Sequence, residues 1–301
     1  MAEAGGAAEA GVHLAAEIAS QPDCWRRAAA LAGDLRALLP PGRVALAGCG
    51  TSFYVAQAAA VLWEAAGLGE ADAFAASEMP ARRPYDTVVV VSRSGTTTEV
   101  ADLLRRLGDA RTLAVVGDAT GPVSRRATHH LELGFADERS VVQTRFATSV
   151  VALFRALAGD DVEPAAAAAA AALERPAPAP DGAERFVFLG TGAAVGLAHE
   201  AALKLREAAL TVTESYPAME YRHGPIAIAG PGVVVWLLGT PPAGLADDVR
   251  RTGATVVDDD LDPLADLVRV QATALARARA RGLDPDHPRH LTRAVHLPAA
   301  P

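Results

Sequence analysis

Short apolar runs, each followed by a polar turn and then by a helical pattern, recur along the first half of the chain. Each run is short enough for one buried strand, and the apolar positions after it recur with the spacing of a helix that buries one face. The predicted strands are 43–48, 87–92 and 113–116. The predicted helices are 52–67, the segment through Val100 to Leu107, and 141–158.

The same pattern restarts after a segment of different composition. Residues 159–184 contain Asp160 and Asp161, a run of alanines, and prolines alternating with alanine, which predicts a helix end followed by a stiff linker. The predicted strands of the second half are 185–189, 233–238 and 254–257. Its predicted helices are 195–210 and 264–281. Strand–loop–helix alternation of this kind predicts an α/β protein with parallel sheets, helices on both faces, and ligands at the carboxyl ends of the strands.

Composition and charge exclude several classes of function. The formal net charge of the 301 residues is −8, and no basic stripe of the kind that binds nucleic acid is present. No apolar stretch approaches the roughly 18 residues that cross a bilayer, and the first residues do not have the pattern of a secretory signal. The two cysteines, Cys24 and Cys49, are too few for a disulfide framework or a zinc site. We therefore expect a cytoplasmic protein without a metal, a cofactor, a nucleic-acid partner or a membrane partner.

The first candidate binding loop follows the first predicted strand and reads Gly48-Cys49-Gly50-Thr51-Ser52. Glycines let the backbone approach a ligand, and the N-terminus of the next helix offers unpaired N–H groups to an anion. Ser52 could equally be an ordinary helix N-cap, so the loop alone leaves both interpretations open. The third glycine of a dinucleotide fingerprint is missing from this loop, which argues against that class of site.

The second candidate loop, residues 92–99, is richer in hydroxyl groups. It reads Ser-Arg-Ser-Gly-Thr-Thr-Thr-Glu and lies between an apolar strand and a helix. Hydroxyls and successive N–H groups suit the oxygens of a phosphomonoester. Thr96 and Glu99 have the spacing of a capping box, but one cap does not require five hydroxyl residues. The loop therefore predicts a phosphate site.

Two further groups of polar residues lie in the second half. Glu200, Lys204 and Glu207 fall on one face of a predicted helix, which taken alone is the pattern of a solvated salt-bridge stripe. Residues 214–225 place His223 in a Gly-Pro turn flanked by glutamates and tyrosines. A lone histidine is more often structural than catalytic, so neither group identifies a site without further information.

Taken in order, these motifs resemble a known family. Gly-Cys-Gly-Thr-Ser, the Ser-x-Ser-Gly-x-Thr loop, residues 202–207 (Ala-Leu-Lys-Leu-Arg-Glu) and residues 220–225 (Glu-Tyr-Arg-His-Gly-Pro) are similar to the tandem sugar isomerase (SIS) domains of glucosamine-6-phosphate synthase and its relatives. The resemblance runs from about Arg43 to the C-terminal stretch 288–295. It implies two tandem SIS domains, each a flavodoxin-like parallel sheet flanked by helices. We expect an N-terminal extension at 1–25, the first domain at 26–160, an Ala/Pro-rich linker at 161–184, and the second domain with a C-terminal tail at 185–301.

The resemblance also implies roles for individual residues. Glu207 matches the glutamate that moves a proton between C1 and C2 of the sugar, and His223 matches the histidine that assists ring opening from a neighbouring subunit. The remaining matches are expected to bind the substrate. They are Gly50, Thr51, Ser52, Ser92, Arg93, Ser94, Thr97, Glu200, Lys204 and Arg293.

Two departures from the synthase pattern separate this sequence from a synthase. The residues before Arg43 are too few for a glutaminase domain, and Arg293 stands where the synthases have the lysine that forms an imine with the ketose. Arginine stays protonated and cannot form an imine. Arg93 also replaces a glutamine of the phosphate loop.

We therefore expect a phosphosugar isomerase or deaminase of the aldose–ketose isomerase type that acts as a homodimer, with its active site at the subunit interface. The preferred reaction is conversion of glucosamine 6-phosphate to fructose 6-phosphate and ammonia. Three alternatives remain open: a ketose/aldose isomerase for another phosphosugar, a deglycase, and a non-catalytic sugar-phosphate sensor.

Overall fold

The computed structural model describes residues 10–80, 82–175 and 182–298. These residues form two compact units, each built around one parallel sheet. The five-stranded unit comprises residues 23–80, 82–139, 145–162 and 291–298, and the four-stranded unit comprises residues 10–22, 140–144, 163–175 and 182–290. Pro176, Pro178 and Pro180 of the predicted linker, and the first nine residues of the predicted N-terminal extension, lie outside the described residues.

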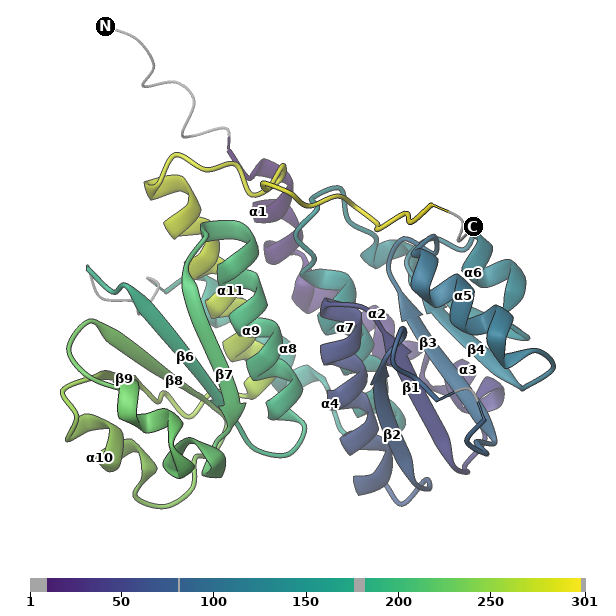
Figure 1. The fold of residues 1–301 in the computed structure, drawn as a ribbon, viewed down its shortest axis with the longest axis horizontal. Helices are drawn as coiled ribbons and strands as arrows, with labels where there is room; N and C mark the ends of the chain where they lie inside the picture. The colour runs from purple at the N-terminus through teal and green to yellow at the C-terminus, as the bar shows by residue number, and fades with distance from the viewer. Residues whose placement is uncertain (1–9, 81, 176–181, 299–301) are drawn as a thin grey trace, which may run out of the picture. The chain divides into compact units, whose positions relative to one another are not determined.

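The five-stranded unit has strand order β2-β1-β3-β4-β5 (Figure 1). This is the flavodoxin-like order, in which the chain builds the sheet outward in both directions from β1 and β3. Its strands are β1 (Val44–Gly48), β2 (Ala71–Ala75), β3 (Thr87–Ser92), β4 (Thr112–Val116) and β5 (His129–Glu132). Its helices are α2 (Gln21–Ala30), α3 (Ala32–Leu38), α4 (Thr51–Ala65), α5 (Thr98–Leu107), α6 (Pro122–Arg126) and α7 (Arg145–Leu157), with a 3-10 turn at Gly134–Ala136.

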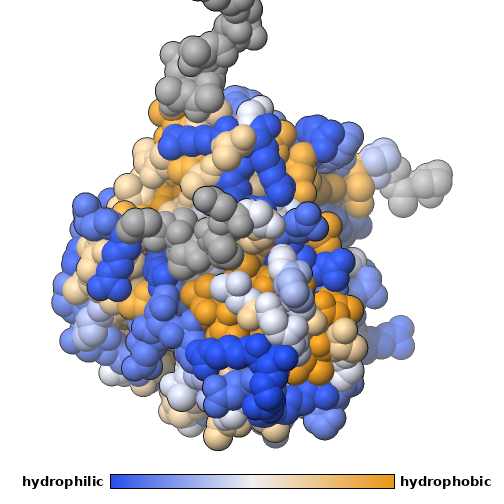
Figure 2. Space-filling model, turned by 90° about the vertical axis from the view of Figure 1, so that its left-hand side faces the viewer, coloured by the Kyte–Doolittle hydropathy of each residue, from blue (hydrophilic) through white to orange (hydrophobic). Residues whose placement is uncertain are grey.

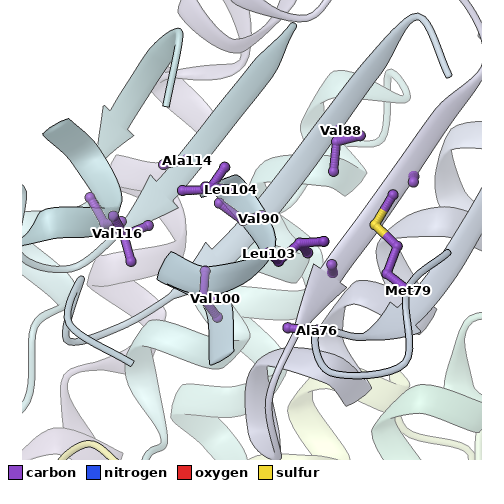
Figure 3. Close-up of a cluster of buried hydrophobic side chains, with 12 residues drawn as sticks. Ala76, Met79, Val88, Val90, Val100, Leu103, Leu104, Ala114 and Val116 are labelled. Atoms are coloured by element: carbon purple, nitrogen blue, oxygen red, sulfur yellow. The ribbon is translucent and has the colours of Figure 1, made fainter. Parts of the chain in front are cut away.

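The central strands of this unit are apolar on both faces because helices cover both. Alternate residues such as Val88 and Val90 of β3 pack against Val100 and Leu103 of α5 (Figure 3). Val89, between them, is equally buried on the side of α4 and α7. Uninterrupted apolar strands are typical of parallel sheets enclosed in this way.

The four-stranded unit repeats the same order on a smaller scale, β7-β6-β8-β9. Its strands are β6 (Arg185–Gly190), β7 (Val212–Pro217), β8 (Val233–Leu238) and β9 (Thr255–Val257). Its helices are α1 (Val12–Ala19), α8 (Glu163–Leu173), α9 (Ala194–Ala209), α10 (Leu245–Arg250) and α11 (Pro263–Ala280), with 3-10 turns at Met219–His223 and Pro225–Ile228. Helices α8, α9 and α11 pack together, and α10 belongs to a second cluster with β8.

The predicted strands and helices are confirmed, and the structure adds elements that the pattern did not predict. Three edge strands, β2, β5 and β7, were missed. The alanine run forms α8, in which Ala165, Ala166 and Ala169 are buried, although the pattern indicated only a helix end there. Among the described residues no helix is long and apolar enough to cross a membrane, and the face in Figure 2 mixes hydrophilic and hydrophobic areas.

One buried carboxyl group makes the stability of the four-stranded unit depend on pH. Asp266 accepts a hydrogen bond from Trp236 Nε1 at 2.8 Å. Burial raises the pKa of Asp266 to about 7, with smaller contributions from Asp259 and Asp258 against the opposing effects of Trp236 and Arg269. An unfolded aspartate titrates near pH 4. The folded protein therefore binds the extra proton between these values, and its stability falls as the pH rises from about 4 to about 7.

We predict that Asp266→Asn removes this dependence. The amide oxygen can still accept from Trp236, and the variant carries no charge to bury. Urea unfolding from pH 4 to pH 8 should show the parent losing a few kcal/mol more than the variant over that range. Asp109→Asn, at an exposed position, serves as the control. Parallel pH profiles for parent and Asp266→Asn would contradict the prediction.

Candidate functional site

Strands β1 and β3 define the switch point of the five-stranded sheet. They pair in parallel, with Val44 opposite Thr87 and Ala47 opposite Val90, and the chain continues from β1 to one edge of the sheet and from β3 to the other. Ligands of open α/β sheets bind at the carboxyl ends of two such strands. Both predicted binding loops start there.

The first loop makes a sharp turn directly into α4. A Cβ atom on Gly48 would lie 2.6 Å from the carbonyl carbon of Ser52, so the helix can approach the strand only over a glycine. Gly50, with φ of 53°, is the N-cap, and no side chain caps the helix. The N-cap interpretation of Ser52 is therefore wrong: Thr51 and Ser52 are the first two residues of α4, and both are buried.

The thiol within this loop stays protonated. Burial, reinforced by the negative charge of Glu99, raises the pKa of Cys49 to about 11. Since the thiolate is the reactive form of cysteine, Cys49 has the chemistry of a packing residue.

The second loop gathers hydroxyl groups around a left-handed glycine. Gly95 has φ of 63°, and a Cβ atom there would lie 2.3 Å from the Asp118 carbonyl oxygen. Ser94 Oγ accepts hydrogen bonds from Thr96 N at 3.2 Å and from Thr96 Oγ1 at 3.1 Å. Ser92 Oγ is buried and makes no hydrogen bond within the described residues. A buried hydroxyl without a partner costs free energy unless something binds it.

Thr96 and Glu99 have the spacing of a capping box, but they do not form one in the structure. The N-cap of α5 is Thr97, and it makes no side-chain capping bond. The first backbone N–H group of α5 instead bonds to the C-terminal segment. Thr98 N donates to the Val295 carbonyl oxygen at 3.2 Å, and Leu297 N donates to Thr98 Oγ1 at 3.0 Å.

Arg93 and Arg293 hold this C-terminal segment against the loop. Arg93 is buried and donates from Nη2 to the Arg293 carbonyl oxygen at 2.7 Å. The Arg293 guanidinium contacts both carboxylate oxygens of Asp137, each at 2.7 Å, and the Glu138 carbonyl oxygen. Both distances to Asp137 are from Nη2, so one guanidinium nitrogen bridges the two carboxylate oxygens in a charge-assisted hydrogen bond. Sequence reasoning placed both arginines in the substrate site, and it missed their partner Asp137.

The second group of predicted residues lies on α9 of the four-stranded unit. Lys204 Nζ lies 2.6 Å from Glu207 Oε2 and 3.3 Å from Glu200 Oε1. The side chains of Glu200 and Lys204 are 0% and 1% exposed, whereas that of Glu207 is 19% exposed. The interpretation as a solvated stripe is therefore wrong. The three residues form a buried chain of charges, and only Glu207 reaches the surface.

Glu207 and His223 are not brought together within one chain. Glu207 lies in the last turn of α9, before β7 begins, and His223 ends the 3-10 turn that follows β7. The six residues of β7 span about 20 Å. His223 is exposed. Sequence reasoning also missed His287, which lines a pocket with Glu207; the spacing of Asp284 and His287, three residues apart, was the available signal.

Comparisons with known proteins find similarity over part of the chain to a family model and over most of it to individual proteins. Residues 37–158 match the SIS domain family model. The glutamine–fructose-6-phosphate aminotransferase (isomerizing) of Methanothermobacter thermautotrophicus is 28% identical over 305 residues, which cover 84% of this chain and 51% of that protein. The corresponding enzyme of Aeropyrum pernix is 28% identical, over 92% of this chain and 54% of that protein. The chain thus spans about half the length of these curated relatives.

Solved structures with the same fold cover nearly the whole chain. Glucosamine-6-phosphate deaminase from Thermotoga maritima superposes with a TM-score of 0.79 at 24% identity, over 95% of this chain and 100% of that one. Tagatose-6-phosphate ketose/aldose isomerase from Escherichia coli gives a TM-score of 0.78 at 18% identity, over 93% and 96%. At these identities the likeness is one of fold.

Proposed function

We propose that this chain is a phosphosugar isomerase or deaminase whose preferred reaction converts glucosamine 6-phosphate to fructose 6-phosphate and ammonia, and the match of residues 37–158 to the SIS domain family model supports this proposal. The observation that carries the proposal is the Glu207 carboxylate, which the buried Lys204 holds at 2.6 Å while it remains partly exposed. A carboxylate fixed in one position is the base that transfer of a carbon-bound proton requires.

The hydroxyl loops are the proposed phosphate site. Ser52, Ser92, Ser94 and Thr97 supply hydroxyl groups, and the N-termini of α4 and α5 supply N–H groups and a positive dipole end. Their position after β1 and β3, at the switch point, supports this assignment. Arg93 adds a positive charge and, together with Arg293, keeps the C-terminal segment beside the loop.

In the proposed reaction Glu207 removes the proton from C2 of the open-chain aminosugar and returns it to C1. The product is an imine at C2, which water converts to the ketone with release of ammonia. Positioned proton transfer of this kind typically contributes about 10²–10⁴-fold to a rate. His223 is assigned to ring opening and Glu200 to support of Lys204.

We further propose that the four-stranded unit is a second SIS domain and that the protein acts as a homodimer. The same strand order supports the first point, as does Gly190, where a Cβ atom would lie 2.1 Å from the Ala194 carbonyl oxygen and thus repeats the close approach at Gly48. The distance along β7 supports the second, because His223 could serve Glu207 only from another chain.

The test is a coupled assay for ammonia and fructose 6-phosphate with glucosamine 6-phosphate as the substrate. Formation of both products is expected. A parallel panel of tagatose 6-phosphate, fructose 6-phosphate and a fructosamine phosphate covers the other reactions. Isomerised sugar without ammonia would replace the deaminase by a ketose/aldose isomerase, and cleavage of the fructosamine adduct alone would indicate a deglycase. Tight binding in calorimetry without any turnover would indicate a sensor.

Ser92→Ala tests the phosphate site separately. Loss of one hydrogen bond to a charged oxygen should weaken sugar-phosphate binding by about 10–100-fold, and the melting temperature should hold, because no protein hydrogen bond of Ser92 Oγ is lost. Calorimetry and thermal unfolding measure the two effects. Ser149→Ala is the matched control, since its hydroxyl is also buried and makes no hydrogen bond within the described residues but lies on α7. Equal affinities for parent and Ser92→Ala would remove Ser92 from the site.

A further inference from the structure

A small pocket opens beside Glu207 in the four-stranded unit. It has a volume of about 40 Å³ and lies between the last turn of α9 and the segment that follows α11. Glu207, Asp284, His287 and Arg289 line it, together with apolar residues that include Leu283. The lining of the pocket therefore includes the proposed base, a histidine, a second carboxylate and a guanidinium.

The histidine is held by a carboxylate that is itself fixed. Asp284 Oδ2 lies 2.9 Å from His287 Nδ1, and Asp284 Oδ1 accepts hydrogen bonds from Gly11 N at 3.0 Å and from Asp286 N at 3.1 Å. Asp286 in turn accepts from Leu14 N at 2.8 Å at the start of α1. The segment that carries His287 is thus attached to α1 by carboxylate–backbone bonds at both aspartates.

This arrangement determines which ring nitrogen is available. When Nδ1 donates its proton to Asp284, Nε2 is left to accept a proton from another molecule. The side chain of His287 is 82% exposed, so Nε2 is accessible to solvent. The hydrogen bond to Asp284 and the charges of Asp284 and Asp286 raise the pKa of His287, and the smaller effect of desolvation opposes them. A neutral imidazole oriented in this way can take up a proton at Nε2.

The size and polar lining of the pocket suit water. About 40 Å³ accommodates water, which needs at least about 10–15 Å³ and two to four polar partners, but it is too small for a sugar phosphate. Glu207, Asp284, His287 and Arg289 offer the polar partners. The pocket is thus a place for water next to the group that is proposed to form the imine.

We propose that His287, oriented by Asp284, activates the water that hydrolyses the imine and releases ammonia. The inference rests on the proposed function. His287 Nε2 removes a proton from water as the oxygen bonds to C2 and the electron pair of the C=N bond moves to nitrogen. The imidazolium then gives its proton to that nitrogen, which becomes an amino group. His287 Nε2 next takes the hydroxyl proton and passes it to the amino nitrogen, so that C2=O forms as the C2–N bond breaks and ammonia leaves. The sum is imine plus water giving ketone plus ammonia.

Other groups fit this step less well. Lys204 is buried between Glu200 and Glu207, and an ammonium in an ion pair cannot accept a proton. Arg293 cannot replace water as the nucleophile that attacks the imine, because a guanidinium does not deprotonate in proteins. His223 lies at the other end of β7. Among the described residues that line the pocket, His287 is the one imidazole, and its ring nitrogen can both accept a proton and return it.

The experiment separates the two stages of the reaction with His287→Asn. Exchange of the C2 hydrogen of glucosamine 6-phosphate with D2O, followed by NMR, reports on Glu207, and ammonia release reports on hydrolysis. We expect exchange within threefold of the parent and ammonia release slower by about 10²-fold. His130→Asn, an exposed histidine on β5, is the matched control and should change neither rate.

Asp284→Asn tests the positioning role of the carboxylate. The amide oxygen can keep the bond from Gly11 N, which turns the amide NH2 toward His287 Nδ1, so that Nδ1 accepts and Nε2 carries the proton. Ammonia release should therefore fall by about as much as in His287→Asn, while C2 exchange keeps its rate, a split that a general loss of structure would not give. Asp286, Glu207 and Arg289 also face this region and are unchanged in the variant.

The possible outcomes are distinct. Unchanged ammonia release in His287→Asn, or an equal loss of exchange and release, would overturn the role of His287 and leave the proposed function in place. A parent protein that exchanges the C2 hydrogen without releasing ammonia would overturn the role and leave an isomerase. A parent that does neither would overturn the deaminase function itself.

Discussion

Glu207→Gln is expected to lower kcat for glucosamine 6-phosphate by about 10²–10⁴-fold, with little change in sugar-phosphate affinity. Glutamine has the shape of glutamate and retains an oxygen that can accept from Lys204 Nζ, which lies 2.6 Å from Glu207 Oε2, but it cannot accept a carbon-bound proton. The range is the usual contribution of a positioned acid–base group. The proposed phosphate loops lie in the other unit, so binding should persist.

The measurements are the coupled ammonia assay and calorimetry with the sugar phosphate. Glu174→Gln, at an exposed position of the same unit, controls for a general loss of negative charge. Loss of binding together with turnover would contradict the role of Glu207 as a proton shuttle and would make it a binding residue. Retention of turnover would remove it from the mechanism.

Lys204→Met is expected to destabilise the four-stranded unit by about 3–5 kcal/mol. The side chains of Lys204 and Glu200 are almost completely buried, and Lys204 Nζ lies 3.3 Å from Glu200 Oε1. Removing one partner of a buried ion pair leaves the other charge uncompensated in a low-dielectric interior. This destabilises a protein more than replacing both partners does. Glu207 should tolerate the change better, because its carboxylate is partly exposed.

A double variant identifies the cause of that loss. Glu200→Gln combined with Lys204→Met removes the buried charge on both sides, so it should recover most of the stability. Urea unfolding of the parent, the two single variants and the double variant gives the coupling energy. Single-variant losses within about 1 kcal/mol, or simple additivity in the double variant, would contradict a buried ion pair.

Complete burial gives a strand its clearest signal in the sequence, although the partly exposed edge strand β9 was also predicted. The strands at 87–92 and 233–238 were predicted with the bounds that the structure shows, because every residue is buried and the apolar run is uninterrupted. The missed strands are at sheet edges. In β2 every residue is only half-buried, and β5 begins with two histidines. An edge strand has one neighbouring strand and is partly solvated, so its sequence carries a weaker apolar signal.

In the candidate site, too, local spacing could be predicted from the sequence and long-range contacts could not. The spacing of Glu200, Lys204 and Glu207 predicts one helical face, and the structure agrees. Whether that face meets water or the protein interior depends on packing contacts made by β7 and α11, which no local pattern encodes. Asp137 was missed for a related reason: its partner Arg293 is 156 residues away in the chain.

The order in which the ribosome makes the chain determines when the proposed phosphate loop can contact the C-terminal segment. Residues 293–297 belong to the five-stranded unit, yet they follow the whole four-stranded unit in the chain. Domains generally fold as the ribosome releases them, N-terminal residues first. The sheet behind the proposed phosphate loop can therefore form early, but Arg93 and Thr98 meet their partners only after residues 293–297 have been made. The loop is completed after the four-stranded unit has been made, so a nascent chain does not carry a finished phosphate site.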